Sequence, residues 1–394
     1  MLNNSPFLLF KVECPICKII NEFEMIRVGA YAEDGRDTDF CPMNVKWRYP
    51  RYQAYNPLVF FTATCSNCYY TREFTNSFKD WKNDTGFRTY RLKQVKEKHL
   101  EQLSSADSMI QMIGEMINIR RYPNESAILK LHLAVFDEQL AEHHSKLDLG
   151  RFYLRIGWIF RDMEEGENPQ LVYLRGLMHE LDNKYGQLTQ TVNAVKADAG
   201  MLSQNIRSHF ETDQISAELR SPMLAFQDRY DAEIDEFVRC LDVAEGKLSD
   251  IGELIEEYKT NALDSWGGDS GPAFGKHASF QSFLTQLQKV WPGVAGNERE
   301  ALEIAVQNYK AAFASGRDIA AGTQQIQASY LIAELSRRIG DYDGAKEYFN
   351  STIKSGQEFI YQNRQDRSRT VLARKILELA IEQGRSNFVA AKQA

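Results

Sequence analysis

Two stretches of the sequence decide how its N-terminal part folds: LLFKVECPICKII at residues 8–20 and LVFFTATCSNCYY at residues 58–70. Each is an apolar run that ends in a Cys-x-x-Cys pair, which predicts a strand leading into a tight turn. Two such turns can present four sulfurs to one tetrahedral metal ion. We therefore predict a small zinc-ribbon-like β module over residues 1–92. The predicted metal ligands are Cys14, Cys17, Cys65 and Cys68.

The composition of this segment favours a site made of sulfur alone. The first histidine of the chain is His99, so residues 1–98 offer no imidazole ligand. Four thiolates suit Zn²⁺, and iron in a rubredoxin-like site with the same ligands remains an alternative. Cys14-Pro-Ile-Cys17 also has the shape of a glutaredoxin-type redox pair, although no βαβ pattern follows it. Because 47 residues separate Cys17 from Cys65, an insertion must lie between the two turns.

Two further cysteines and one acidic segment are weaker candidates for metal ligands. Cys41 could replace a ligand, but a lone cysteine usually packs as a small apolar side chain. Cys240 lies in a heptad-patterned region and is predicted to be inert. The segment EDGRDTD at residues 33–39 lacks the spaced ligands and closing glutamate of an EF-hand. We predict a solvated loop there, or a loop tied by pairing of Arg36 with a carboxylate.

Length and charge set limits on the class of protein. A chain of 394 residues predicts two or three structural units. Residues 1–98 hold 15 Lys and Arg against 11 Asp and Glu, and residues 99–394 hold 32 against 43. The net charge of residues 1–98 is therefore +4, which is too small for the strongly basic surface of a dedicated nucleic-acid-binding protein. No apolar run reaches the roughly 18 residues that span a bilayer, and the N-terminus lacks signal-peptide features. We therefore expect a cytoplasmic protein without membrane insertion. In the reducing cytoplasm, paired cysteines usually bind metal and do not form disulfides.

The rest of the chain is predicted to be helical, which makes the fold class mainly α. We expect a first helical part, TPR-like in character, over residues 93–168 and TPR-like repeats over residues 279–394. A glycine-rich linker is expected over residues 264–278. Hydrophobic periodicity predicts helices over residues 89–119, 125–139, 148–163, 298–314, 324–339, 342–356 and 367–382.

One helical stretch, SYLIAELSRRIGDYDGAKEYFNSTI at residues 329–353, resembles a tetratricopeptide repeat. Ala333 and Ala345 would let its two helices approach closely, Gly340 would end the first helix, and Tyr342 would plug the turn. Residues 149–163 resemble the first helix of another such repeat. Stacked repeats form a concave surface for peptides or partner helices, whereas a plain helical bundle would have no such groove.

Residues 169–263 carry the clearest periodicity in the chain. Ser221-Pro222 is a favourable helix start, so we predict two long helices that fold back as an antiparallel coiled-coil hairpin. Pairing of one longer helix between two chains, and hence a homo-oligomer, is the alternative. The apolar positions alternate steps of four and three: Leu181, Tyr185, Leu188, Val192, Val195, Ala199, Leu202 and Ile206, and then Phe237, Leu241, Ala244, Leu248, Ile251, Ile255 and Tyr258.

Several short motifs, taken together, resemble a family of uncharacterised bacterial proteins. They are Cys14-Pro-Ile-Cys17, Arg36-Asp-Thr-Asp39, Asn56-Pro57 and Cys65-Ser-Asn-Cys68-Tyr69. That family is defined by a domain of unknown function with a cysteine-rich head and TPR-like helices. The resemblance covers residues 10–165 and 295–382, and residues 170–290 look like an insertion. The family usually shows Cys-Gly-Tyr at the second pair, where this chain has Cys68-Tyr69-Tyr70. The resemblance implies a zinc-binding head and no known enzymatic activity.

No catalytic constellation stands out in the sequence. We therefore expect a non-enzymatic protein–protein interaction scaffold or assembly factor, with partners on the TPR-like groove and the coiled-coil hairpin. One alternative is a nucleic-acid-binding protein that stacks bases on the aromatic and basic loop at residues 46–52. A thiol redox protein that uses Cys14 and Cys17 is another.

Overall fold

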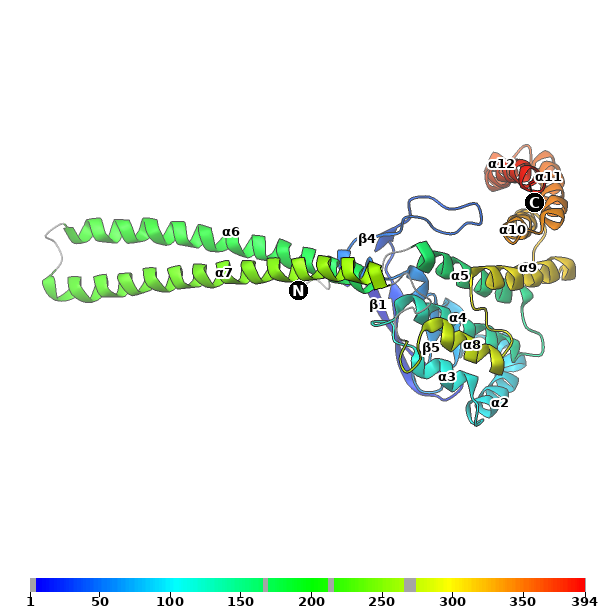
Figure 1. Ribbon diagram of the computed structural model, residues 1–394, viewed down its shortest axis with the longest axis horizontal. Coiled ribbons are helices and arrows are strands. Elements are labelled where there is room, and N and C mark those ends of the chain that lie inside the picture. Colours follow the sequence, from blue (N-terminus) through cyan, green and yellow to red (C-terminus); the bar gives the residue numbers. More distant parts are fainter. Residues whose placement is uncertain (1–4, 166–168, 212–215, 266–273, 394) are drawn as a thin grey trace. The chain divides into compact units, whose positions relative to one another are not determined.

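A computed structural model describes residues 5–165, 169–211, 216–265 and 274–393 of the chain (Figure 1). Helices dominate, and the strands are short antiparallel pairs near the N-terminus, which confirms the predicted fold class. The chain divides into two compact units. The first unit comprises Met1–Arg48, Tyr55–Glu167 and Asp269–Ala394, and the second, the helix-pair unit, comprises Tyr49–Ala54 and Asn168–Gly268.

Three strand pairs build the N-terminal part of the first unit. The longest pair joins β1 (Phe7–Glu13) to β2 (Ile20–Ile26) and flanks the first Cys-x-x-Cys turn. The others join β3 (Tyr31–Ala32) to β4 (Lys46–Trp47), and β5 (Thr62–Thr64) to β6 (Thr71–Glu73). The second cysteine pair therefore lies in the turn between β5 and β6.

The prediction of a strand that runs into this second turn is mostly wrong. Only Thr62–Thr64 is extended, because residues 57–60 form a 3₁₀ helix, η2 (Pro57–Phe60). The Asn56 side chain accepts a hydrogen bond from the Leu58 amide at 3.0 Å. Proline fixes the backbone angle at the first helical position. Local capping therefore outweighed the β propensity of the apolar run.

The first unit contains most of the helices. The helix predicted over residues 89–119 is wrong in its continuity: the chain breaks, and the Ser108 hydroxyl caps a new helix by accepting from the Gln111 amide at 3.1 Å. The bounds are α1 (Asn76–Lys79), the π-helical turn η3 (Phe87–Arg91), α2 (Leu92–Leu103), α3 (Met109–Met116), α4 (Pro123–Gln139), α5 (Lys146–Glu165), α8 (Phe280–Val290), α9 (Glu298–Ser315), α10 (Thr323–Arg338), α11 (Tyr342–Gln362) and α12 (Arg367–Ala390).

Helix α4 is buried on nearly all sides and forms the centre of this unit. It contacts α3, α5, η2, β5 and β6. Helix α5 packs closely on α9, and two glycines spaced seven residues apart permit this approach. A Cβ atom at Gly157 would lie 2.9 Å from Leu302 Cδ2, and one at Gly150 would lie 3.1 Å from Tyr309 Cδ2. Larger side chains at either glycine would push the helices apart.

The helix pair predicted around Gly340 is present. Gly340 adopts a backbone φ of +87° between α10 and α11, a conformation that glycine accepts without strain. Ala333 and Ala345 are fully buried where α10 and α11 meet. Helix α12 packs on both of these helices. Because a tetratricopeptide array requires several stacked copies of such a pair, the repeat assignment stays a prediction.

The helix-pair unit is built on α6 (Pro169–Glu211) and α7 (Ala217–Ser265), which run side by side (Figure 1). Their contacts pair later residues of α6 with earlier residues of α7, so the helices are antiparallel. Lys196 Nζ lies 2.8 Å from Asp235 Oδ1, and Arg207 Nη2 lies 2.7 Å from Asp228 Oδ1. The short helix η1 (Pro50–Tyr52) also packs on α6. Interlocking coiled-coil packing of the heptads stays a prediction.

The predicted start of the second long helix is wrong by about one turn. Helix α7 begins at Ala217 and includes Pro222. The Ser216 carbonyl accepts hydrogen bonds from the amides of Leu219 and Arg220 and so nucleates the first turn. Proline then lies in the second turn, where its missing N–H removes a single hydrogen bond.

The glycine-rich linker predicted over residues 264–278 lies partly outside the described residues, which resume at Phe274. Phe274 is 1% exposed and packs against Tyr122 and Phe283, with ring centroids 4.7 and 5.5 Å away. The end of the predicted linker is therefore an anchored part of the first unit.

Candidate metal centre

The first Cys-x-x-Cys turn forms where β1 gives way to β2. The Lys18 amide donates to the Cys14 carbonyl at 3.0 Å, and the Cys14 amide donates to the Ile19 carbonyl at 2.8 Å. Lys18 follows the second cysteine with a φ of +67°. This left-handed residue reverses the chain and leaves both thiols on the inner side of the turn.

The second turn repeats this geometry between β5 and β6. The Tyr69 amide donates to the Cys65 carbonyl at 3.0 Å, and the Cys65 amide donates to the Tyr70 carbonyl at 2.9 Å. Tyr69 takes the left-handed position with a φ of +60°. The Tyr69 ring lies against Gly114, where a Cβ atom would come within 2.1 Å of its Cγ, so α3 helps to hold this strained residue.

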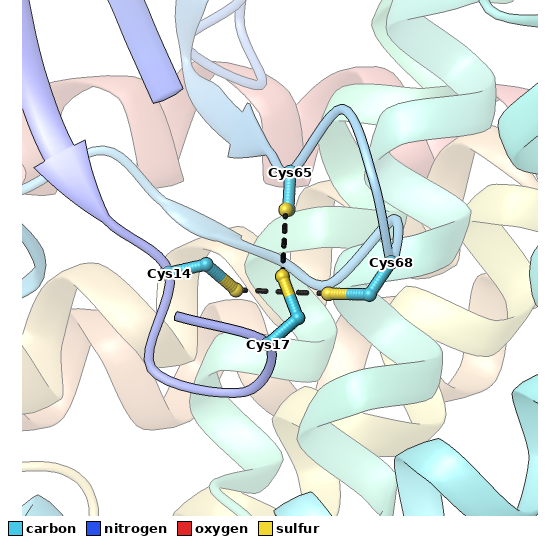
Figure 2. A group of neighbouring side chains, drawn as sticks. All are labelled: Cys14, Cys17, Cys65 and Cys68. Atoms are coloured by element: carbon cyan, nitrogen blue, oxygen red, sulfur yellow. Dashed lines mark hydrogen bonds between the residues drawn. The ribbon is translucent and has the colours of Figure 1, made fainter. Parts of the chain in front are cut away.

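The structure brings all four predicted ligands together (Figure 2). Cys14 Sγ lies 3.6 Å from Cys68 Sγ, and Cys17 Sγ lies 3.5 Å from Cys65 Sγ. All four sulfurs lie within 4.8 Å of one another. Zinc–sulfur bonds of about 2.3 Å place tetrahedral sulfurs about 3.8 Å apart. The cluster therefore has the dimensions of a four-thiolate metal site.

The close pairs join sulfurs from different turns. Cys14 faces Cys68 and Cys17 faces Cys65, so the cluster links two segments that are far apart in the sequence. In a dithiol redox centre the two sulfurs of one Cys-x-x-Cys turn are the reacting pair. The arrangement thus favours a shared metal over the redox use of Cys14 and Cys17.

Three of the four cysteines are almost fully buried. Cys14, Cys65 and Cys68 are at most 2% exposed, and Cys17 is half-buried. Hydrogen bonds from the Cys14 and Cys68 thiols lower the pKa of Cys65, whereas the pKa of Cys14 is raised to about 12 by its interaction with Cys65. Neighbouring thiols therefore cannot all ionise by themselves. A bound cation removes this restriction, because a coordinating thiol is deprotonated outright.

Asn21 links the two turns behind the sulfurs. Its amide nitrogen lies 3.4 Å from Cys65 Sγ, and its side-chain oxygen accepts from the Ser66 amide at 2.8 Å. Asn21 is 6% exposed and belongs to β2, which follows the first turn. A single side chain at the start of β2 therefore orients the second turn and donates to a ligand sulfur.

A buried histidine and carboxylate hold the second turn from the other side. His99 Nε2 donates to the Cys68 carbonyl at 2.8 Å, and His99 Nδ1 lies 2.6 Å from Asp137 Oδ1. Asp137 Oδ2 also accepts from the Thr71 amide at 2.7 Å. Burial acts to lower the pKa of His99, but the Asp137 carboxylate outweighs it and raises that pKa. Helices α2 and α4 thereby clamp the turn that carries Cys65 and Cys68.

No local pattern in the sequence marks Asn21, His99 or Asp137 as supporting residues. Each comes from a different element, and their positions near the sulfurs depend on how α2, α4 and β2 pack. The remaining cysteines lie elsewhere. Cys41 is half-buried and its thiol lies 3.7 Å from the Pro42 carbonyl, while Cys240 is exposed on α7.

The acidic segment at residues 33–39 corrects the expectation of a solvated loop. Arg36 does pair with Glu33 at 3.2 Å, but Asp39 is fully buried. Arg161 of α5 lies 2.9 Å from Asp37 and 2.8 Å from Asp39. We call the group of Asp37, Asp39 and Arg161 the Asp–Arg clasp.

Helix α10 completes the attachment of this segment. Arg338 lies 2.8 Å from Asp37 Oδ2 and donates to Thr38 Oγ1 at 2.8 Å. The Tyr330 hydroxyl donates to the Thr38 carbonyl at 2.8 Å. Burial raises the pKa of Asp37, but the Thr38 amide and Arg338 outweigh it and hold that pKa below its usual value. The motif at residues 36–39 therefore joins the N-terminal module to the helices.

The loop predicted to stack nucleic-acid bases has its tryptophan inside the fold. Trp47 is 6% exposed, and its indole Nε1 donates to the Tyr55 carbonyl at 2.8 Å. Its ring packs against Phe7 and Phe60. Stacking of a base on Trp47 would require the ring to leave this core.

The fold and the cysteine cluster define a mainly α-helical protein with a cysteine-rich N-terminal head that could hold a metal ion. The chain belongs to the family described as "uncharacterized protein conserved in bacteria (DUF2225)", whose model matches residues 9–203 and 286–372. The match continues into α6, so the segment outside the family pattern begins after residue 203 and not near residue 170 as expected. Searches of curated proteins and of solved structures found no match. Within the described residues, no helix is long and apolar enough to cross a bilayer.

Proposed function

We propose that Cys14, Cys17, Cys65 and Cys68 bind one Zn²⁺ ion as a structural site. All four donors are sulfur, three of them are buried, and the set leaves no protein ligand position open. Closed sites of this kind stabilise a fold, whereas catalytic zinc sites keep one position for water or substrate. Iron would meet the same ligands, so the metal must be identified by measurement.

The test compares metal content in two cysteine variants. Wild-type protein from cells supplied with both zinc and iron should contain one zinc per chain and lack the visible absorption of ferric thiolates. Cys65→Ser should lose most of this zinc, because it removes a buried ligand. Cys240→Ser is the matched control, since Cys240 is exposed on α7, and it should keep its zinc. Iron at one atom per chain would refute the proposed metal, and full zinc in Cys65→Ser would refute the site.

We further propose that the protein is a non-enzymatic interaction scaffold or assembly factor of the cytoplasm. The observation that carries this proposal is an open groove between α11 and α12, of about 480 Å³. Ile360, Leu377 and Ile381 give it an apolar lining, and Tyr361 at its rim is 70% exposed. None of the six cysteines forms a disulfide within the described residues, which fits a reducing compartment.

Charge at this groove indicates the chemistry of its partner. Arg364 and Arg374 both line it, and Glu378 is the single acidic residue among the lining side chains. Such a surface suits a protein segment with an apolar anchor and flanking acidic residues. An amphipathic helix or a short acidic peptide of another protein would meet both requirements.

The experiment places a photoreactive amino acid at position 361 and crosslinks the protein in its own cells. Purified candidate partners are then titrated against the wild type, Arg374→Glu and Arg385→Glu. Arg374 lines the groove, while Arg385 is exposed on the same helix outside it. We expect Arg374→Glu to weaken binding at least tenfold and Arg385→Glu to leave it unchanged. A partner that binds all three proteins equally, or no adduct at position 361, would refute this docking surface.

A further inference from the structure

The apolar heptad positions of α6 separate into two rows in the structure. The row of Tyr185, Val192, Ala199 and Ile206 is partly buried against α7. A second row, at strict seven-residue spacing, stays exposed. Its four side chains are between 45% and 60% exposed and are Leu181, Leu188, Val195 and Leu202.

Helix α7 has the same division. The row that contains Ile234, Leu241 and Leu248 is partly buried. A second row, again at seven-residue spacing, is exposed: Met223, Tyr230, Phe237, Ala244 and Ile251. Leu219 and Phe226, each 61% exposed, lie next to this row. Large apolar side chains at such regular intervals are not the scattered exposed residues found on most surfaces.

The two exposed rows lie on one face of the helix pair. Leu188 follows the partly buried Tyr185 by three residues, and Phe237 follows the partly buried Ile234 by three residues. Each exposed row is therefore rotated from its buried row by the same angle, since an α-helix turns 100° per residue. In an antiparallel pair, reversing one helix also reverses the side to which that rotation points. Equal rotations thus place both rows on the same side, and we call them together the apolar face.

The apolar face has the size of a stable interface. The exposed rows span 28 residue steps on α7 and 21 on α6, or about 42 Å and 32 Å at 1.5 Å per residue, and each helix is about 11 Å wide. The face therefore covers about 800 Å², which is the usual contribution of each partner to a specific complex. Because its period is seven residues, it fits a partner built from helices of the same period.

We propose that the apolar face binds the same face of a second copy of this chain, so that two helix pairs form a four-helix bundle. A second copy supplies the matching length and period by definition, and face-to-face contact is the self-complementary arrangement of twofold dimers. This inference rests on the proposed scaffold function and names one of its partners.

Charge selects how the two copies align. Helix α6 carries four basic and four acidic residues, counting Lys, Arg, Asp and Glu, whereas α7 carries five basic and thirteen acidic ones. Two α7 helices placed together would repel each other. Within one chain, Lys196 and Arg207 of α6 already pair with acidic residues of α7. The dimer therefore sets α6 of each copy against α7 of the other.

The test is sedimentation equilibrium of the full chain with a charge placed on the apolar face. Leu188→Glu/Val195→Glu puts two carboxylates in the exposed row of α6. Gln190→Glu/Ala197→Glu adds the same two charges at exposed positions on the opposite side of that helix. We expect twice the 45.3 kDa chain mass for the wild type and the control. The variant on the apolar face should weaken dimerisation at least 100-fold. Circular dichroism should show equal helix content in all three proteins.

Two outcomes overturn the dimer: a wild type that stays monomeric at tens of micromolar, or an apolar-face variant that dimerises as the wild type does. Loss of helix in that variant would show that Leu188 and Val195 pack within the chain, which also overturns it. A failure of the dimer proposal can be distinguished from a failure of the scaffold proposal. A monomer that still binds a partner at the groove between α11 and α12 refutes only the dimer, and a dimer without such a partner refutes only the groove.

Discussion

The Asp–Arg clasp gives the sharpest test of what fixes the N-terminal module to the helices. The perturbation is Asp39→Ala. Asp39 is fully buried and its oxygens accept from Arg161 at 2.8 Å, from the Trp158 indole at 3.1 Å and from the Cys41 amide at 3.2 Å. The substitution removes these three hydrogen bonds at once and leaves their donors inside the protein.

The expected loss in unfolding free energy depends on which carboxylates still pair with Arg161 after the substitution. Removing one partner of a buried ion pair costs about 3–5 kcal/mol, because the other charge stays buried without compensation. Arg161 is 13% exposed in its side chain and still pairs with Asp37 at 2.9 Å and with Glu298 at 2.6 Å. We therefore expect the lower end of that range, a loss of about 3 kcal/mol in unfolding free energy.

Urea unfolding followed by tryptophan fluorescence is the assay, because Trp158 touches Asp39 directly. Asp228→Ala is the matched control. Asp228 lies 2.7 Å from Arg207, as close as the clasp, but its side chain is 68% exposed. Exposed ion pairs contribute about 0–1 kcal/mol, so this control should unfold at nearly the same urea concentration as the wild type.

A loss below about 1 kcal/mol for Asp39→Ala, or a loss equal to that of Asp228→Ala, would refute the reasoning that burial decides the strength of the clasp. A double-mutant cycle adds a second check. Arg161→Met together with Asp39→Ala leaves neither buried charge of that pair. The double variant should therefore be less destabilised than the sum of the two single variants.

Two further predictions concern buried titratable groups. Burial lowers the pKa of Lys130 from 10.5 to about 8, although the negative charge of Glu24 acts to raise it. The unfolded chain then binds more protons between pH 8 and pH 10.5, so unfolding free energy should rise with pH across that window in the wild type. Lys130→Met should lack this rise in urea titrations at each pH, and an identical rise would contradict the assignment. His99→Ala removes the hydrogen bond to the Cys68 carbonyl and should weaken metal binding about 10–100-fold in chelator competition. His143→Ala, at an exposed position, should bind as the wild type does, and equal affinity of all three proteins would exclude a supporting role for His99.

Local signals predicted much of the secondary structure. The apolar periodicity placed most helices within a few residues of their observed bounds, and Gly340 ends α10 as its position predicts. Local competition explains two of the wrong predictions. Asn56-Pro57 started a 3₁₀ helix inside an apolar run, and Ser108 capped a new helix inside a continuous helical pattern. Each of these two misses depended on one side-chain hydrogen bond that periodicity does not report.

The candidate site could be predicted only in part, for a related reason. Cys-x-x-Cys spacing is a local property, so the four sulfurs were identifiable before any fold was known. Asn21, His99 and Asp137 reach the cluster from β2, α2 and α4, and nothing in their own neighbourhoods marks them. The sequence predicts a solvated loop around Asp37 and Asp39, because acidic residues rarely lose their water without a partner. Their partners, Arg161 and Arg338, lie more than 120 residues away in the chain.

By itself, the sequence determined most of the segments that become helices, where the two cysteine turns form, and which heptad positions are apolar. These properties depend on residues within one or two turns of each other. Only the tertiary structure decided which sulfur faces which, that His99 and Asp137 clamp the second turn, and that one heptad row is buried while its neighbour stays exposed. The physical reason is that burial and long-range pairing depend on how distant elements pack, and spacing along the chain does not encode that packing directly.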